Sequence, residues 1–142
     1  WVFYWATMIA TTDIPLGNMA SEAKLRGFSR LKPAFHNTLA GLRAAWLEPA
    51  FHMEAWAALF MLPWAFVLGQ HWLETAALLG TVVLVLIVEI LNTAVESAID
   101  RVGPEWHEMS KRAKDLGSAA VFLSLLLCAG VWLAALVHAW PR

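Results

Sequence analysis

One stretch decides the fold, residues 85–100, which read VLIVEILNTAVESAID: an apolar helix acquires carboxylates before it ends. At about 100° per residue, positions i, i+3, i+4 and i+7 share one face of a helix. Four polar residues occupy these positions and form what we call the polar stripe: Glu89, Asn92, Thr93 and Glu96. Ionisable groups at membrane depth are costly and by default indicate a functional site. The stretch therefore predicts a membrane helix that carries a functional site.

The composition indicates an integral membrane protein. Of its 142 residues, 60% are hydrophobic and 15% are charged, against about 45–50% and about 25% in an ordinary soluble domain. The net charge of −1 and the absence of a basic excess give no support for nucleic-acid binding. The single Cys128 lies in an apolar run, so no disulfide framework is expected.

The hydropathy pattern predicts an all-α membrane protein. We expect an amphipathic surface helix over about 28–47, with apolar residues stepping by three and four opposite several cations. Three membrane spans are expected over about 53–72, 74–100 and 116–138. Residues 1–20 do not resemble the rest; we expect a non-native N-terminal extension outside the fold, with an interfacial anchor as the alternative, and a membrane domain over 21–142.

The basic residues predict the orientation. Nine of the ten Lys and Arg lie before the first span or between the second and third. Cytoplasmic loops carry the excess of Lys and Arg. We therefore expect a multi-pass protein with its N-terminus in the cytoplasm and its C-terminus outside.

Depth then separates the two glutamates of the stripe. At about 1.5 Å per residue, Glu89 lies about 22 Å along the helix from Glu74, and Glu96 lies about 10 Å further. Against a hydrocarbon core of about 30 Å, Glu89 falls near the inner interface and Glu96 reaches cytoplasmic water. A site there could take one substrate from the lipid and another from the cytosol.

The residue types of the stripe suit metal-assisted acid–base chemistry. Mg²⁺ typically takes one or two protein carboxylates, with phosphates supplying other ligands. A carboxyl group at the apolar margin is desolvated, which suits a general base near neutral pH. One glutamate for the metal and one for the base is a coherent division. The alternative is that Glu89 and Asn92 hydrogen-bond across helices as structural glue, and spacing alone leaves both open.

The loop between the second and third spans carries Lys111, Arg112 and Lys114. These cations suit nucleotide phosphates, although a basic cytoplasmic loop is expected from topology alone. His107-Glu108 is no metalloprotease motif, because Lys111 stands where the second histidine would be. The chain also contains no glycine-rich nucleotide loop of the familiar kinds.

Four strings then carry a family resemblance: GLRAAW (41–46), VEILNTAVE (88–96), AIDR (98–101) and RAKDLGSAAV (112–121). Together, in this order, they resemble the bacterial integral-membrane diacylglycerol kinase family over about residues 24–140. Between Arg43 and Phe51 the chain is one residue shorter than the family pattern. The resemblance implies a trimeric helical bundle of three-span protomers in the bacterial inner membrane, with sites shared between protomers at the cytoplasmic interface.

The implied reaction is phosphoryl transfer from ATP, with Mg²⁺, to the hydroxyl of 1,2-diacylglycerol, a membrane lipid. By motif position, Glu89 is implied as the catalytic base, and Glu48 and Glu96 as metal ligands. The implied nucleotide contacts are Arg30, Asn37, Glu48, Glu96, Glu105, Trp106, His107, Lys114 and Asp115. The implied lipid contacts are Arg30, Arg43, Ala44, Ala45, Trp46, Glu54, Glu89, Asn92, Ser118 and Trp132.

Two other functions stay open from the sequence. Some members of the same family phosphorylate undecaprenol instead of diacylglycerol. The second open function is a non-catalytic cation or proton pathway through Glu54, Glu89 and Glu96. Such a pathway needs polar groups across the outer half of the membrane, where residues 75–88 offer only Thr75, Thr81 and glycine.

Overall fold

The computed structural model of the protein describes residues 31–139. Within them it has four helices and no strand: α2 (Leu31–Trp46), α3 (Pro49–Leu68), α4 (Trp72–Asp100) and α5 (Glu108–Ala139). Helices α3, α4 and α5 are each long and apolar enough to cross a membrane. The predicted all-α membrane class is confirmed. The expected N-terminal extension, residues 1–20, and Arg30 lie outside the described residues.

A tight corner joins α2 to α3. The N–H of Leu47 donates to the carbonyl of Ala44 at 3.1 Å, and the N–H of Glu48 donates to the carbonyl of Ala45 at 3.0 Å. Pro49 then opens α3, which suits proline because the first helical N–H has no partner within the helix. The corner therefore ends one helix and starts the next within two residues.

Helix α3 runs over Pro49–Leu68, whereas the sequence predicted a span over 53–72. The difference comes from the helix ends, which hydropathy does not register. Pro49 extends the start, and Gly69 closes the end by donating its N–H to the carbonyl of Ala65 at 3.0 Å. Pro63 lies inside the helix, which a membrane helix tolerates when neighbouring groups satisfy the freed carbonyl.

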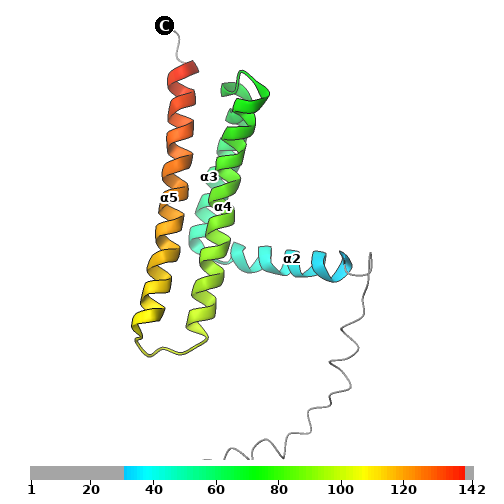
Figure 1. Cartoon of the computed structure of the whole chain (residues 1–142). Helices are drawn as coiled ribbons and strands as arrows, with labels where there is room; N and C mark the ends of the chain where they lie inside the picture. Colours follow the sequence, from blue (N-terminus) through cyan, green and yellow to red (C-terminus); the bar gives the residue numbers. More distant parts are fainter. Residues whose placement is uncertain (1–30, 140–142) are drawn as a thin grey trace, which may run out of the picture. The chain divides into compact units, whose positions relative to one another are not determined.

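Helices α4 and α5 form an antiparallel pair joined by a short connection at one end (Figure 1). The indole of Trp132 meets the carbonyl of Leu78 near one end of the pair, and Lys114 meets Asp100 near the other. Helix α5 begins at Glu108, well before the predicted start at 116. Residues 108–115 are polar and helical, so hydropathy detects only the apolar part of this helix.

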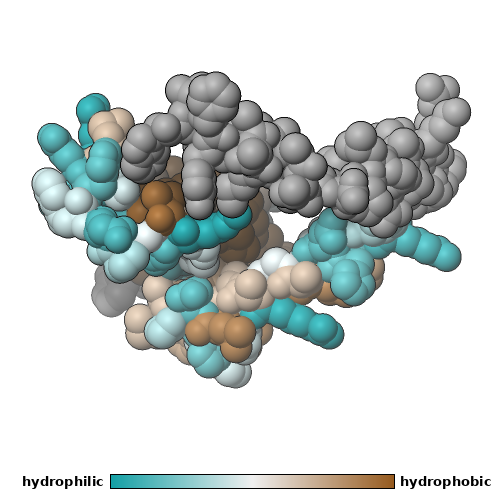
Figure 2. Space-filling view, turned by 90° about the horizontal axis from the view of Figure 1, so that it is seen from below, coloured by the Kyte–Doolittle hydropathy of each residue, from teal (hydrophilic) through white to brown (hydrophobic). Residues whose placement is uncertain are grey.

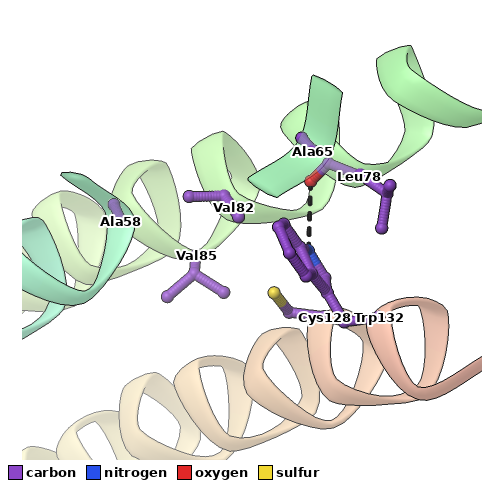
Figure 3. Close-up of a cluster of buried hydrophobic side chains, with 7 residues drawn as sticks. All are labelled: Ala58, Ala65, Leu78, Val82, Val85, Cys128 and Trp132. Atoms are coloured by element: carbon purple, nitrogen blue, oxygen red, sulfur yellow. Dashed lines mark hydrogen bonds between the residues drawn. The ribbon is translucent and has the colours of Figure 1, made fainter. Parts of the chain in front are cut away.

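The core of the bundle is a cluster of seven buried side chains (Figure 3): Ala58, Ala65, Leu78, Val82, Val85, Cys128 and Trp132. Helix α3 contributes the two alanines, and small residues let helix backbones approach closely in a membrane. The indole N–H of Trp132 donates to the carbonyl of Leu78 at 3.3 Å, the dashed line in Figure 3. This bond links α5 to α4 inside the apolar core.

Candidate active site

Glu89 is buried in α4, with only 4% of its surface exposed. Neither ion pair within residues 31–139 involves it. Burying a carboxylate without a partner is costly, and proteins keep such groups where function requires them. Among the described residues no cation pairs with this carboxylate, which makes it a candidate to take a proton from a bound molecule.

Three other carboxylates lie near Glu89. Those of Glu48, Glu54 and Glu96 each lie close enough for their charge to repel that of Glu89. Glu48 and Glu54 come from the start of α3, while Glu89 and Glu96 lie on α4. The packing of α3 against α4 therefore concentrates negative charge in one place.

Glu48 stands at the corner before α3. It occupies the N-cap position with extended backbone angles, φ −80° and ψ 126°, and its side chain makes no capping hydrogen bond. A capping carboxylate normally accepts a backbone N–H in the first turn. Because this carboxylate does not, capping of the helix does not occupy its oxygens.

An aromatic group holds this corner together. The rings of Trp46 and His52 meet edge-to-face with centroids 4.5 Å apart. The indole N–H of Trp56 donates to Nε2 of His52 at 3.3 Å. Among the predicted lipid contacts of this segment, Ala45 is buried and Arg43, Ala44 and Trp46 are exposed.

Asn92 is hydrogen-bonded to another residue of the polar stripe. Its amide nitrogen donates to Oε1 of Glu96 at 3.2 Å, one helical turn further on. Its carbonyl oxygen Oδ1 and Oε2 of Glu54 are both buried without a hydrogen-bond partner in the described part of the chain. Buried polar atoms are usually paired, so two orphaned oxygens near one acidic cluster indicate a place where a further group binds.

The residues present suit Mg²⁺ when a phosphate substrate completes the site. Within residues 31–139, no three His, Cys, Asp or Glu side chains are arranged to hold a metal ion by themselves. Magnesium needs only one or two protein carboxylates when phosphates and water supply the remaining oxygens. Glu48 and Glu96 satisfy that requirement.

The connection between α4 and α5 is polar. Figure 2 looks onto this end of the bundle, where hydrophilic side chains gather. The predicted nucleotide contacts Glu105, Trp106 and His107 are all exposed here. Nδ1 of His107 accepts the N–H of Met109 at 3.2 Å at the start of α5. These groups are open to a solute from water.

Two further predicted nucleotide contacts are held in ion pairs. Nζ of Lys114 lies 2.5 Å from Oδ1 of Asp100, and Nζ of Lys111 lies 2.5 Å from Oδ2 of Asp115. The first pair joins the start of α5 to the last residue of α4. The charge of Glu96 also acts on Lys114. The ammonium is therefore kept beside the acidic cluster.

The family model described as "Prokaryotic diacylglycerol kinase" matches residues 36–136. The chain belongs to the prokaryotic diacylglycerol kinase family. It is 44% identical over 107 residues to the diacylglycerol kinase of Escherichia coli K12, an alignment that covers 75% of this chain and 88% of that one. It is 41% identical over 110 residues to that of Haemophilus influenzae Rd, covering 77% and 93%. It is 40% identical over 107 residues to that of Pseudomonas aeruginosa PAO1, covering 75% and 87%.

Membership of the diacylglycerol kinase family makes the chain a kinase and a multi-pass membrane protein. The family match runs from α2 to α5 and includes every predicted site residue except Arg30. The alternative of a non-catalytic cation pathway is not favoured. The resemblance noted in the sequence is therefore confirmed as a family relationship.

Within this family fold, the predicted lipid contact Trp132 lies in the apolar core. Trp132 is 8% exposed and bonded to Leu78 in the core. Leu78 lies about 16 Å before Glu89 along α4, at about 1.5 Å per residue. Ser118 is exposed on α5, and Asn37 lies on α2. The substrate role of Trp132 and the nucleotide role of Asn37 stay predictions, as do the roles of the other predicted site residues.

Sequence reasoning singled out neither Asp100 nor Gly117. Asp100 pairs with Lys114, and a side chain on Gly117 would collide with Asn92. The signal for Gly117 was a glycine inside a helical run, which often marks close packing. The signal for Asp100 was an acidic residue at the unfavourable C-terminal end of a helix.

Proposed function

We propose that the protein transfers the γ-phosphoryl group of ATP to the free hydroxyl of 1,2-diacylglycerol, releasing phosphatidic acid and ADP. The observation that carries this proposal is Glu89, a buried carboxylate with no ion-pair partner among the described residues, at the polar end of three apolar helices. The relatives named above are all called diacylglycerol kinase. Site and family therefore support the same reaction.

Glu89 is the proposed general base. It accepts the hydroxyl proton of diacylglycerol as the oxygen attacks the γ-phosphorus, and the bond to the β-phosphate oxygen breaks. Kinases position a carboxylate at the attacking hydroxyl in this way. No cation within residues 31–139 forms an ion pair with its oxygens. A general base of this kind contributes about 10²–10⁴-fold to the rate.

Glu48 and Glu96 are the proposed ligands of Mg²⁺. When bound, the ion neutralises negative charge on the ATP phosphates. Glu96 receives a hydrogen bond from Asn92, and Glu48 has no capping role that would hold its carboxylate away. The two ligands come from different helices, so their separation depends on the packing of α3 against α4.

Lys114 is the proposed phosphate contact. It lies at the end of α5 nearest the acidic cluster and is bonded to Asp100. Lysine binds phosphate as a point charge. A phosphate of the nucleotide would therefore replace the exposed carboxylate of Asp100 as the partner of the Lys114 ammonium. An exposed ion pair contributes only about 0–1 kcal/mol. Exchange of partners therefore costs little.

We further propose a homotrimer in the bacterial inner membrane, with the site at the cytoplasmic interface and shared between protomers. Large apolar side chains are exposed along α3, α4 and α5, as expected where lipid or another protomer covers them. The cations before the first span, Arg101 after α4 and the cations in the first two turns of α5 favour a cytoplasmic location for this end. Glu48 is exposed, so a neighbouring protomer could close the site from that side.

The test is a transfer assay with the purified full chain in detergent micelles. MgATP with labelled γ-phosphate is offered with diacylglycerol, with undecaprenol, or with no lipid. We expect labelled phosphatidic acid from the first sample only. A Glu89→Gln preparation controls for contaminating kinases. Label in undecaprenol instead would move the substrate to the other lipid of this family, and label in neither lipid would refute the kinase proposal.

A further inference from the structure

Gly117 lies where α5 comes closest to the polar stripe. A Cβ atom built on Gly117 would overlap Oδ1 of Asn92 and would lie 3.3 Å from its Cγ and 3.9 Å from its Cβ. The side chain of Asn92 therefore fills the space that any other residue at 117 would occupy. Real Cβ atoms do not approach a neighbour so closely, so a larger residue would push the amide away.

The same amide is bonded at its other end. Nδ2 of Asn92 donates to Oε1 of Glu96 at 3.2 Å, while Oδ1 faces Gly117 and has no hydrogen-bond partner in residues 31–139. Packing against Gly117 thus fixes the position of Oδ1, and Nδ2 at the other end of the amide holds the carboxylate of Glu96 by a hydrogen bond. A shift of the amide would therefore move the donor of the hydrogen bond to Glu96.

We propose that Gly117 is a positioning residue of the metal site, acting through Asn92 on the carboxylate of Glu96. It is glycine because the amide needs the volume that a methyl group would fill. This inference rests on the proposed function, which makes Glu96 a Mg²⁺ ligand. Groups that orient a metal ligand are worth about 10–100-fold in metal affinity or activity.

Two other glycines show that this contact is specific. A Cβ atom on Gly130, also in α5, or on Gly80, in α4, would meet nothing within 4 Å. In a helix interior, glycine is about 1 kcal/mol less favourable than alanine at all three positions. Gly117→Ala, Gly130→Ala and Gly80→Ala therefore share the same gain in helix propensity. Only Gly117→Ala carries the contact with Asn92.

The test compares these three variants by metal binding and by stability. Binding of Mn²⁺ with a non-hydrolysable ATP analogue is followed by electron paramagnetic resonance, and the Mg²⁺ dependence of activity is titrated in parallel. We expect Gly117→Ala to weaken Mn²⁺ binding about ten-fold or more and to raise the half-saturating Mg²⁺ concentration similarly. Its thermal midpoint should change by about as much as those of the two control variants, because the displaced atom ends a flexible side chain. The two control variants should keep the wild-type metal curves.

A double variant tests the route through Asn92. If Gly117 acts on Glu96 by way of the amide, Asn92→Ala/Gly117→Ala should bind Mn²⁺ no more weakly than Asn92→Ala alone. Losses that add in full would overturn the inference. Unchanged Mn²⁺ binding in Gly117→Ala would overturn it too, while leaving the proposed function intact. Wild-type protein that neither binds the Mn²⁺ nucleotide nor transfers phosphate would instead remove the proposed function itself.

Discussion

The two halves of α4 pack against the same neighbour in opposite ways. Near its start, Leu78 is 1% exposed, and its carbonyl accepts both the indole N–H of Trp132 and the hydroxyl of Thr81, at 3.3 and 3.0 Å. In its second half, Glu89 is buried without an ion-pair partner in the described chain, and Oδ1 of Asn92 has no donor there. The first half of α4 pairs its polar groups within the protein, whereas the second half leaves Glu89 without an ion-pair partner and Oδ1 of Asn92 without a hydrogen-bond donor among the described residues.

The difference teaches where stability and function lie. Lipid is as apolar as leucine, so membrane helices associate through packing and hydrogen bonds instead of the hydrophobic effect. The half of α4 that contains Leu78 has both the close packing and the interhelical hydrogen bond. The Glu89 half leaves buried charge uncompensated, as functional sites often do at some cost to stability. Variants in the two halves should therefore separate stability from activity.

The largest expected effect is on activity, from Glu89→Gln in the polar half. Turnover should fall by about 10²–10⁴-fold, the usual contribution of a general base. The thermal midpoint should stay equal or rise, because a neutral amide replaces a buried charge. Phosphate transfer and thermal unfolding measure the two effects. A variant that loses its fold or its oligomer would instead support the structural-glue interpretation of this residue.

The next effect is on stability, from Leu78→Ala in the apolar half. Buried Leu→Ala changes cost about 2–5 kcal/mol in soluble proteins. We expect the lower end, about 2 kcal/mol, because lipid is as apolar as leucine and only the packing part of the cost remains. Unfolding in mixed micelles gives the change, and the KM for MgATP of the folded fraction should match wild type. A raised KM would show that the two halves are not separable.

A smaller effect should follow from Glu96→Gln, which removes one proposed metal ligand and keeps the shape of the side chain. We expect the half-saturating Mg²⁺ concentration to rise about ten-fold, or about 1.4 kcal/mol, with little change in thermal midpoint. Titration of activity with Mg²⁺ at saturating ATP measures it. Glu74→Gln, the same change in the first turn of α4 at the opposite end from Glu96, should need the same Mg²⁺ as wild type. An unchanged titration for Glu96→Gln would contradict the ligand role.

The smallest effect should come from Trp132→Phe, which removes one hydrogen bond and retains an aromatic ring. The expected loss is about 1 kcal/mol of unfolding free energy, the usual net value of such a bond. The KM for diacylglycerol decides between the core position of Trp132 and the lipid contact implied by resemblance. A core role predicts a change in stability alone, and a lipid contact predicts a raised KM.

Much of the candidate site could be predicted because it lies on one helix. The polar stripe follows from helical periodicity, and the hydrogen bond from Asn92 to Glu96 joins residues four apart. Glu48 could be assigned only through the family resemblance, since no local pattern links it to Glu89. The charge pattern identified Lys114 as one of three cations suited to phosphate, and only the resemblance chose it among them. Helix ends such as Pro49 and Glu108 escaped hydropathy, which averages over the caps and polar turns that set them.

The sequence by itself determined the all-α membrane class, the family and the polar face of α4, because these depend on composition and on the local period of a helix. Only the tertiary structure decided that Glu89 is buried, that Glu48 and Glu54 lie near it, that Trp132 belongs to the core, and that Asn92 rests against Gly117. Those facts depend on the register and approach of separate helices. Packing sets both, and no single helix encodes them.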